Sequence, residues 1–183
     1  RRLITEDKVR PDGRKVDEIN LVMLDRERHY GLMKEARDLG ARIMLISDGD
    51  VNPAMECCIE GSGVHMVVGT GGAPEGVLAA AALKCVGGDM QARLKPETEE
   101  EIRRCHEMGI TDVNQVLTLD DLVRTDDVIF AATAITRGNL LNAIQYFPGG
   151  ARTHTIVMRS KTGTVRFLDT VHMDEKLKSL KAK

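Results

Sequence analysis

Short apolar runs alternate with polar loops and one-sided apolar stretches through the first half of the chain. Residues 19–24, INLVML, and residues 42–46, RIMLI, are continuous apolar runs of the length that buried parallel strands have. Residues 29–39 between them carry an apolar stripe with helical spacing, and a glycine follows where a helix usually stops. The stripe consists of Leu32, Met33, Ala36 and Leu39. The pattern therefore predicts a strand, a helix and a second strand.

The same unit then repeats along the chain. We predict a short helix that Pro53 opens and that runs through Glu60, a third strand over residues 64–69, and a helix from Pro74 to about Val86. Successive strand, loop and helix units predict a parallel sheet with right-handed crossovers. In such a sheet the loops that follow the strands lie together at the carboxyl edge, where open α/β sheets bind ligands. The segments DRERH, SDGDVN and GTGGAPE should therefore be neighbours.

The pattern changes beyond Leu94. Residues 95–109 read as a solvated helix closed by a glycine, and a short helix follows a capping residue at Thr118. Residues 128–134 are predicted as another buried strand, and residues 143–172 as an antiparallel hairpin with the turn KTGT. The predicted fold class is α/β, a layered sandwich with a mixed, mainly parallel sheet plus this C-terminal hairpin.

Composition and charge narrow the range of partners. The chain has 183 residues, 42% of them hydrophobic, which suits one ordinary α/β domain with a real core. A net charge of -2 gives no sign of a nucleic-acid-binding protein. Because no apolar run is long enough to span a bilayer and the first residues lack a secretory signal, we expect a cytoplasmic protein without a membrane partner. The cysteines are expected to be structural thiols: Cys57, Cys58, Cys85 and Cys105.

Two of the predicted edge loops carry charged side chains that can bind a ligand. Arg26 and Arg28 follow the first strand, and two guanidinium groups on one short loop can clamp an anion, although a solvated loop with local ion pairs fits equally well. Asp48 and Asp50 flank Gly49, which permits a left-handed backbone. These carboxylates can accept hydrogen bonds from sugar hydroxyls or hold a hard metal ion. The alternative is an ordinary turn in which Asp50 caps the next helix.

The glycine-rich third loop fits neither familiar nucleotide-binding template. A proline stands where the last glycine of G-x-G-x-x-G would be, and no Lys-Ser/Thr follows as a P-loop requires. The backbone amides of residues 71–73, Gly72 among them, can still meet a phosphate or hydroxyl oxygen at a helix N-terminus. Glu75 is either a metal ligand or a carboxylate that favours the helix dipole, which is worth about 0.3–1 kcal/mol.

Four long segments in order resemble one family. LDRERH, LISDGDV, GTGGAPEGVLAAAALKCVGGDMQARL and YFPGGARTHTIVMRSKTGTVRF look like the second half of a class II fructose-1,6-bisphosphatase, over about residues 21–172. The resemblance extends to the subgroup that also uses sedoheptulose 1,7-bisphosphate. It implies the layered fold of the lithium-sensitive, metal-dependent sugar phosphatases. The implied reaction, which serves gluconeogenesis or carbon fixation, is metal-dependent removal of the 1-phosphate from fructose 1,6-bisphosphate.

The resemblance also assigns roles to residues of this chain. Arg26 and Arg28 would grip phosphate or sugar oxygens, and the Asp48–Asp50 turn, with Gly49, would bind the sugar. Gly72 would contribute backbone near the substrate, and Glu75 would be a ligand of Mg²⁺ or Mn²⁺. No residue of this half would be catalytic, because the water-positioning residues and the other metal ligands of the family lie in its N-terminal half.

The same resemblance sets the domain boundaries. We expect a charged lead-in over residues 1–18, a substrate-binding domain over 19–172 and a tail over 173–183, with residues 143–172 packing on the family's N-terminal half. Either this sequence is a fragment or another polypeptide supplies that half, and alone it should be inactive. The alternative is a non-catalytic sugar-phosphate-binding or regulatory subunit. Association into homo-oligomers is expected in either case. Arg137 departs from the family, whose members tend to carry aspartate there.

Overall fold

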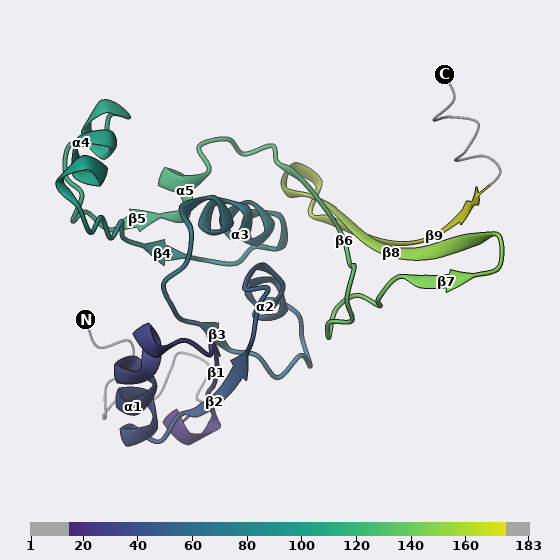
Figure 1. The fold of residues 1–183 in the computed structure, drawn as a ribbon, viewed down its shortest axis with the longest axis horizontal. Coiled ribbons are helices and arrows are strands. Elements are labelled where there is room, and N and C mark those ends of the chain that lie inside the picture. Colours follow the sequence, from purple (N-terminus) through teal and green to yellow (C-terminus); the bar gives the residue numbers. More distant parts are fainter. Residues whose placement is uncertain (1–14, 175–183) are drawn as a thin grey trace.

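A three-stranded parallel sheet forms the first part of the computed structural model, which describes residues 15–174 (Figure 1). Its strands are β1 (Asn20–Leu24), β2 (Arg42–Ile46) and β3 (Met66–Val67), in the order β2-β1-β3. Strand β1 pairs in parallel with both neighbours, so that Leu21 lies opposite Ile43 on one side and Met66 on the other. Because β1 is the central strand, its three middle residues are all buried, as the apolar run predicts.

Helix α1 (Tyr30–Asp38) covers this sheet, as the apolar stripe predicts. It follows a short 3-10 helix, η2 (Glu27–His29), while another, η1 (Val16–Glu18), precedes β1. Gly40, with a φ of 90°, reverses the chain after α1. The helix and β1 share one core of buried side chains: Ile19, Leu21, Met23, Met33, Ala36 and Ala41.

Helices α2 (Val51–Glu56) and α3 (Ala73–Val86) pack against each other beyond the carboxyl end of the sheet (Figure 1). Gly72 is the N-cap of α3, Pro74 lies in its first turn, and Gly87, with a φ of 73°, ends it in a left-handed conformation. The buried face of α3 consists largely of alanine, which lets neighbouring elements approach closely.

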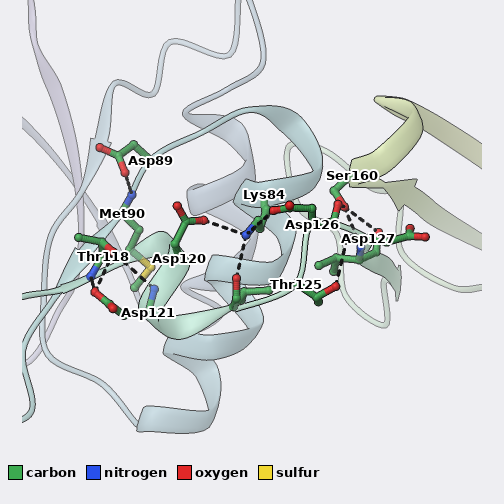
Figure 2. Close-up of polar contacts among 12 residues, drawn as sticks. Lys84, Asp89, Met90, Thr118, Asp120, Asp121, Thr125, Asp126, Asp127 and Ser160 are labelled. Atoms are coloured by element: carbon green, nitrogen blue, oxygen red, sulfur yellow. Dashed lines mark hydrogen bonds and ion pairs between the residues drawn. The ribbon is translucent and has the colours of Figure 1, made fainter.

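Next along the chain come two small helices and a two-stranded antiparallel sheet of β4 (Gln91–Ala92) and β5 (Leu117–Thr118). Helix α4 (Glu99–Glu107) has no buried residue, and Thr118 caps α5 (Leu119–Leu122) by accepting a hydrogen bond from the amide of Asp121, both as predicted. Lys84 links this part to α3, and Figure 2 shows its Nζ donating to Asp120 Oδ1, a hydrogen bond of 2.8 Å. The same nitrogen donates to the carbonyl of Val123, also at 2.8 Å.

A four-stranded antiparallel sheet forms the C-terminal part. Its strands are β6 (Ile129–Thr133), β7 (Gln145–Phe147), β8 (Gly150–Arg159) and β9 (Thr164–Met173), and η3 (Ser160–Thr162) turns the chain between the last two. Strands β6 and β7 pair with one edge of β8, while β9 pairs with the other along its whole length. One face of β6 and β8 packs on α2 and α3 in a second core: Met55, Ala82, Cys85, Phe130, Leu141, Ile156 and Met158.

The α/β class with parallel and antiparallel strands is confirmed, but the expectation of one mixed, mainly parallel sheet is wrong. Parallel and antiparallel strands lie in separate sheets, because residues 128–134 pair with the hairpin instead of extending the parallel order. Only Phe130 of β6 is buried, since this strand has one face on the helices. Strand β2 is also more exposed than predicted, because it lies at the edge of its sheet.

Other predicted boundaries move by a few residues. Helix α2 begins at Val51, before Pro53, and ends at Glu56, four residues earlier than predicted, while β3 contains two residues of the predicted 64–69. Most of the lead-in (1–14) and of the tail (175–183) lies outside the described residues. Within residues 15–174, no helix has the length and apolar character needed to cross a bilayer.

Candidate functional site

The loops that follow β1 and β2 are joined by hydrogen bonds at the carboxyl edge of the parallel sheet. The amide of Asp25 donates to the carbonyl of Ile46 at 2.9 Å, extending the pairing of the strands by one residue. Arg26 then reaches across, and its Nη2 donates to the carbonyl of Ser47 at 2.7 Å. This contact sets the start of the loop that carries Asp48 and Asp50.

The loops that follow β1 and β3 are joined by a buried histidine. His29 is only 2% exposed; its Nδ1 lies 2.9 Å from the carbonyl of Leu24, and its Nε2 accepts a hydrogen bond of 2.8 Å from the amide of Thr70. Because an amide can only donate, the ring is neutral at Nε2 and carries its proton on Nδ1. A Cβ on Gly69 would lie 3.1 Å from the ring, so glycine lets the loop approach this closely.

Arg28 adds a second bond to the same loop. Its Nε donates to the carbonyl of Thr70 at 2.9 Å. Arg26 and Arg28 therefore reach toward opposite neighbours of the central loop, one to the second loop and one to the third. Both side chains are exposed, and the terminal nitrogens of Arg28 donate to no described residue, so they remain available to an anion.

Two carboxylates lie against adjacent glycines of the third loop, one from the second loop and one from the first turn of α3. A Cβ on Gly71 would be 3.1 Å from Asp50 Oδ2, and a Cβ on Gly72 would collide with the carboxylate of Glu75. Among the described residues, neither carboxylate accepts a hydrogen bond or forms an ion pair. Asp50 is the N-cap residue of α2, but its side chain accepts no hydrogen bond from the amides of that helix. Helix capping therefore does not account for an aspartate at this position.

Asp48 and Gly49 shape the second loop as predicted. Gly49 has a φ of 81°, a left-handed conformation in which a side chain would be strained. Asp48 Oδ1 accepts a hydrogen bond of 2.8 Å from the amide of Gly49, while its Oδ2 bonds no described residue. Like Glu75, this carboxylate lies at the surface, where a ligand can reach it.

The site residues predicted from the sequence thus meet at one sheet edge, on loops that contact one another. Within residues 15–174, however, no group of three or more histidine, cysteine, aspartate or glutamate side chains is placed to hold a metal ion. The edge therefore gathers guanidinium groups that can bind an anion and carboxylates that can accept hydrogen bonds from hydroxyls.

Comparison with known proteins gives the family. The model of the bacterial fructose-1,6-bisphosphatases, glpX-encoded, matches residues 8–172. The chain belongs to this family. Its curated relatives include three cyanobacterial proteins, each named D-fructose 1,6-bisphosphatase class 2/sedoheptulose 1,7-bisphosphatase. The protein of Synechococcus elongatus (strain ATCC 33912 / PCC 7942 / FACHB-805) is 44% identical over 179 residues, which cover 91% of this chain and 52% of the relative.

The other two relatives agree in identity and coverage. The protein of Crocosphaera subtropica (strain ATCC 51142 / BH68) is 43% identical over 182 residues, covering 93% of this chain and 53% of the relative. The protein of Synechococcus sp. (strain JA-3-3Ab) is 42% identical over 174 residues, which cover 88% of this chain and 50% of the relative. The chain therefore spans about half the length of the curated glpX-type relatives it matches.

Sequence reasoning missed the role of His29 in this family member. The histidine follows the arginine loop and precedes an apolar helix, which places it near the edge, but only the fold shows that it bonds a loop 41 residues away. Gly69 was noted only as the first glycine of a template that the loop does not fit, and the structure shows that its missing side chain makes room for the imidazole ring.

A buried carboxylate was also missed. Glu56, 3% exposed, accepts hydrogen bonds from Asn52 Nδ2 at 3.1 Å and from Asn139 Nδ2 at 3.2 Å. A Cβ on Gly138 would lie 2.7 Å from Asn52 Nδ2. The loop that carries Arg137 is thus held on α2, the helix that follows the Asp48–Asp50 turn.

The cysteines are free thiols, as predicted. Burial raises the pKa of Cys57 to about 11, with smaller contributions from neighbouring Cys58 and the Glu56 carboxylate. Burial likewise raises the pKa of Cys58 and of Cys85. High thiol pKa values disfavour the thiolate that a nucleophile or metal ligand needs, which fits a structural role.

Proposed function

We propose that this chain is the substrate-binding, C-terminal half of a class II fructose-1,6-bisphosphatase. The complete enzyme would hydrolyse the 1-phosphate of fructose 1,6-bisphosphate, giving fructose 6-phosphate and phosphate. The observation that carries the proposal is that Arg28, Asp50 and Glu75 all lie against the loop before α3: Arg28 bonds Thr70, Asp50 lies beside Gly71 and Glu75 beside Gly72. The names of the relatives support the substrate, and they extend it to sedoheptulose 1,7-bisphosphate.

The proposed roles follow from the free atoms of each side chain. The terminal nitrogens of Arg28 bind phosphate or sugar oxygens. Arg26 contributes the N–H groups that do not already bond the carbonyls of Asp25 and Ser47. Asp48 and Asp50 accept hydrogen bonds from sugar hydroxyls, and Gly49 keeps the two carboxylates on one turn. Gly72 has no Cβ, so the carboxylate of Glu75 can lie directly against its backbone, and the amides at the start of α3 would then be close to a metal-bound phosphate.

We infer that Glu75 is a ligand of a divalent metal, Mg²⁺ or Mn²⁺. A carboxylate without a described partner suits these hard cations, and Asp50 on the adjacent glycine adds negative charge. The remaining ligands and the water-positioning residues would come from the other half, because the described residues do not form a complete site. When bound, the cation would neutralise phosphate oxygens and the leaving group during hydrolysis.

The remaining expectations belong to the same proposal. The complete enzyme would have the layered fold of the lithium-sensitive sugar phosphatases, work in the cytoplasm and form a homo-oligomer. Carboxylates and arginines lie at one edge, but the described residues do not include enough neighbouring metal ligands to hold a cation. This favours a catalytic centre shared with the other half over one formed by this chain alone.

The test is a full-length chimera in which this chain replaces the matching half of the Synechococcus elongatus relative. We expect phosphate release from fructose 1,6-bisphosphate that requires Mn²⁺ or Mg²⁺, and none from the isolated 183 residues. Glu75→Gln should abolish turnover and weaken Mn²⁺ binding measured by electron paramagnetic resonance. The matched control is Glu35→Gln on α1, which should change neither.

Three results would overturn parts of the proposal. Full activity of Glu75→Gln would remove Glu75 from the metal site. A metal-dependent rate from the isolated chain would refute the shared centre. A folded chimera that binds fructose 1,6-bisphosphate by calorimetry without hydrolysing it would favour the alternative of a non-catalytic sugar-phosphate-binding subunit.

A further inference from the structure

Strand β9 has an alternating sequence whose apolar face is left open. Its odd positions are mainly apolar and its even positions mainly polar, a pattern that places the odd positions on a buried face. The side chains on the odd face are Val165, Phe167, Asp169, Val171 and Met173. Yet the apolar members are 44%, 52%, 51% and 51% exposed, in that order.

The register of the sheet shows that this exposed face continues a buried one. Val165 lies opposite Met158, and Phe167 lies opposite Ile156, so the odd face of β9 continues the face of β8 that packs on the helices. Met158 and Ile156 are buried, at 0% and 1% exposure. The apolar face of the core therefore continues from β8 onto β9, where the helices no longer bury it.

A groove marks the boundary between the covered and open parts. It has a volume of about 560 Å³, and its lining comes from α2, α3 and the β8–β9 hairpin, with Val165 and Phe167 contributed by β9. Across from them are mostly apolar side chains, including Ile59 and Val86. Open apolar surface of this extent is typical of an interface.

We propose that the odd face of β9 and this groove are the interface with the half of the family chain that this sequence does not contain. The relatives that match almost all of this chain are about twice as long, so a surface that is open here has a further half-chain available to cover it. The occupant presents apolar side chains to Phe167 and Val171, and a polar group to Asp169, which interrupts the stripe opposite His154. The inference rests on family membership and on packing, so it does not depend on the proposed activity.

The experiment measures thiol accessibility on the two faces of one strand. Val171→Cys on the odd face and Thr170→Cys on the even face are made in the isolated chain and in the full-length chimera described above. Labelling by a maleimide is followed at each cysteine by peptide mapping, which separates the introduced thiol from the natural ones. We expect Val171→Cys to react at least about tenfold more slowly in the chimera than in the isolated chain, while Thr170→Cys reacts alike in both.

The possible outcomes separate the occupants. Equal labelling of Val171→Cys in chimera and isolated chain overturns the proposal. Protection already present in the isolated chain, with a dimer by light scattering, assigns the face to a second copy and also overturns it. A protected but inactive chimera contradicts the proposed function and leaves this interface standing.

A second measurement does not depend on the folding of the chimera. The isolated chain should bind a fluorescent apolar dye at the open stripe, and Phe167→Lys should lower that fluorescence severalfold. Leu168→Lys is the matched control, because Leu168 is 41% exposed on the opposite face of the same strand, and it should lower the signal little. The same loss from both variants, or from neither, would refute the assignment of the open face.

Discussion

Replacing His29 with alanine tests the connection between the first and third site loops. The ring is buried and uses both nitrogens, at 2.9 Å from the carbonyl of Leu24 and at 2.8 Å from the amide of Thr70. His29→Ala removes the ring that partners both backbone groups, of which the Leu24 carbonyl is on a half-buried residue and the Thr70 amide on an exposed one. A buried polar group left unsatisfied costs about 1–3 kcal/mol. We therefore expect the free energy of unfolding to fall by about 2–5 kcal/mol, with lost ring packing included.

The assay has a global and a local readout. Urea denaturation gives the free energy of unfolding, and amide hydrogen exchange followed by nuclear magnetic resonance gives the protection of the Thr70 amide. Tyr30→Ala is the matched control, because Tyr30 is the next residue, is 55% exposed and should change stability by less than about 1 kcal/mol. His29→Gln should recover part of the loss, since its amide offers one donor and one acceptor.

A particular result would refute the reasoning. If His29→Ala lowers stability by less than about 0.5 kcal/mol and leaves Thr70 exchange unchanged, the imidazole does not hold the loop. Loss of stability with unchanged Thr70 exchange would show that the ring contributes packing alone. Only the combined loss supports a histidine that positions the third loop.

Three further predictions concern other parts of the chain. Glu56→Ala should lower the free energy of unfolding by about 1–3 kcal/mol in urea denaturation, because it removes a buried carboxylate that accepts hydrogen bonds from half-buried Asn52 and exposed Asn139, whereas exposed Glu60→Ala should have little effect. Hydrogen bonds from Arg159 lower the pKa of Asp127, so this pair stabilises the fold above about pH 4 and the contribution is lost as the pH falls through the lowered pKa. Thermal scans from pH 7 to 3 should therefore show a smaller decrease in Tm for Asp127→Asn than for the wild type; equal decreases would contradict the assignment. With its pKa raised to about 11, Cys57 should react with iodoacetamide at pH 8 about a hundredfold more slowly than a free cysteine, and mass spectrometry showing similar rates would exclude the raised pKa.

The parallel part of the fold could be predicted because its signals are local. The apolar run before Asp25 and the stripe through Met33 each specify an element by their own periodicity, and successive units then dictate a shared edge. Arg28, Asp50 and Glu75 could accordingly be placed together without coordinates.

The antiparallel part resisted prediction because strand pairing depends on distant residues. Residues 128–134 read as a buried strand, but whether they extend the parallel sheet depends on β8, about 25 residues later in the chain. The hydrogen bonds of His29 and Glu56 depend in the same way on residues 41 and 83 positions away. Side-chain chemistry alone cannot specify such partners.

The division of hydrogen bonds within the site bears on how a shared centre would assemble. Hydrogen bonds to backbone groups of neighbouring loops fix the loop positions, and they come from Arg26, Arg28 and His29. Asp50 and Glu75 keep their carboxylates free of described partners. The loops are therefore preorganised by this half alone, whereas the two carboxylates remain available to substrate, a cation or the other half. If the proposed interface along β9 and the proposed metal role of Glu75 both hold, the other half would add its ligands without first reshaping these loops. Variants on β9 and variants at Glu75 should then impair the activity of the complete protein by separable steps.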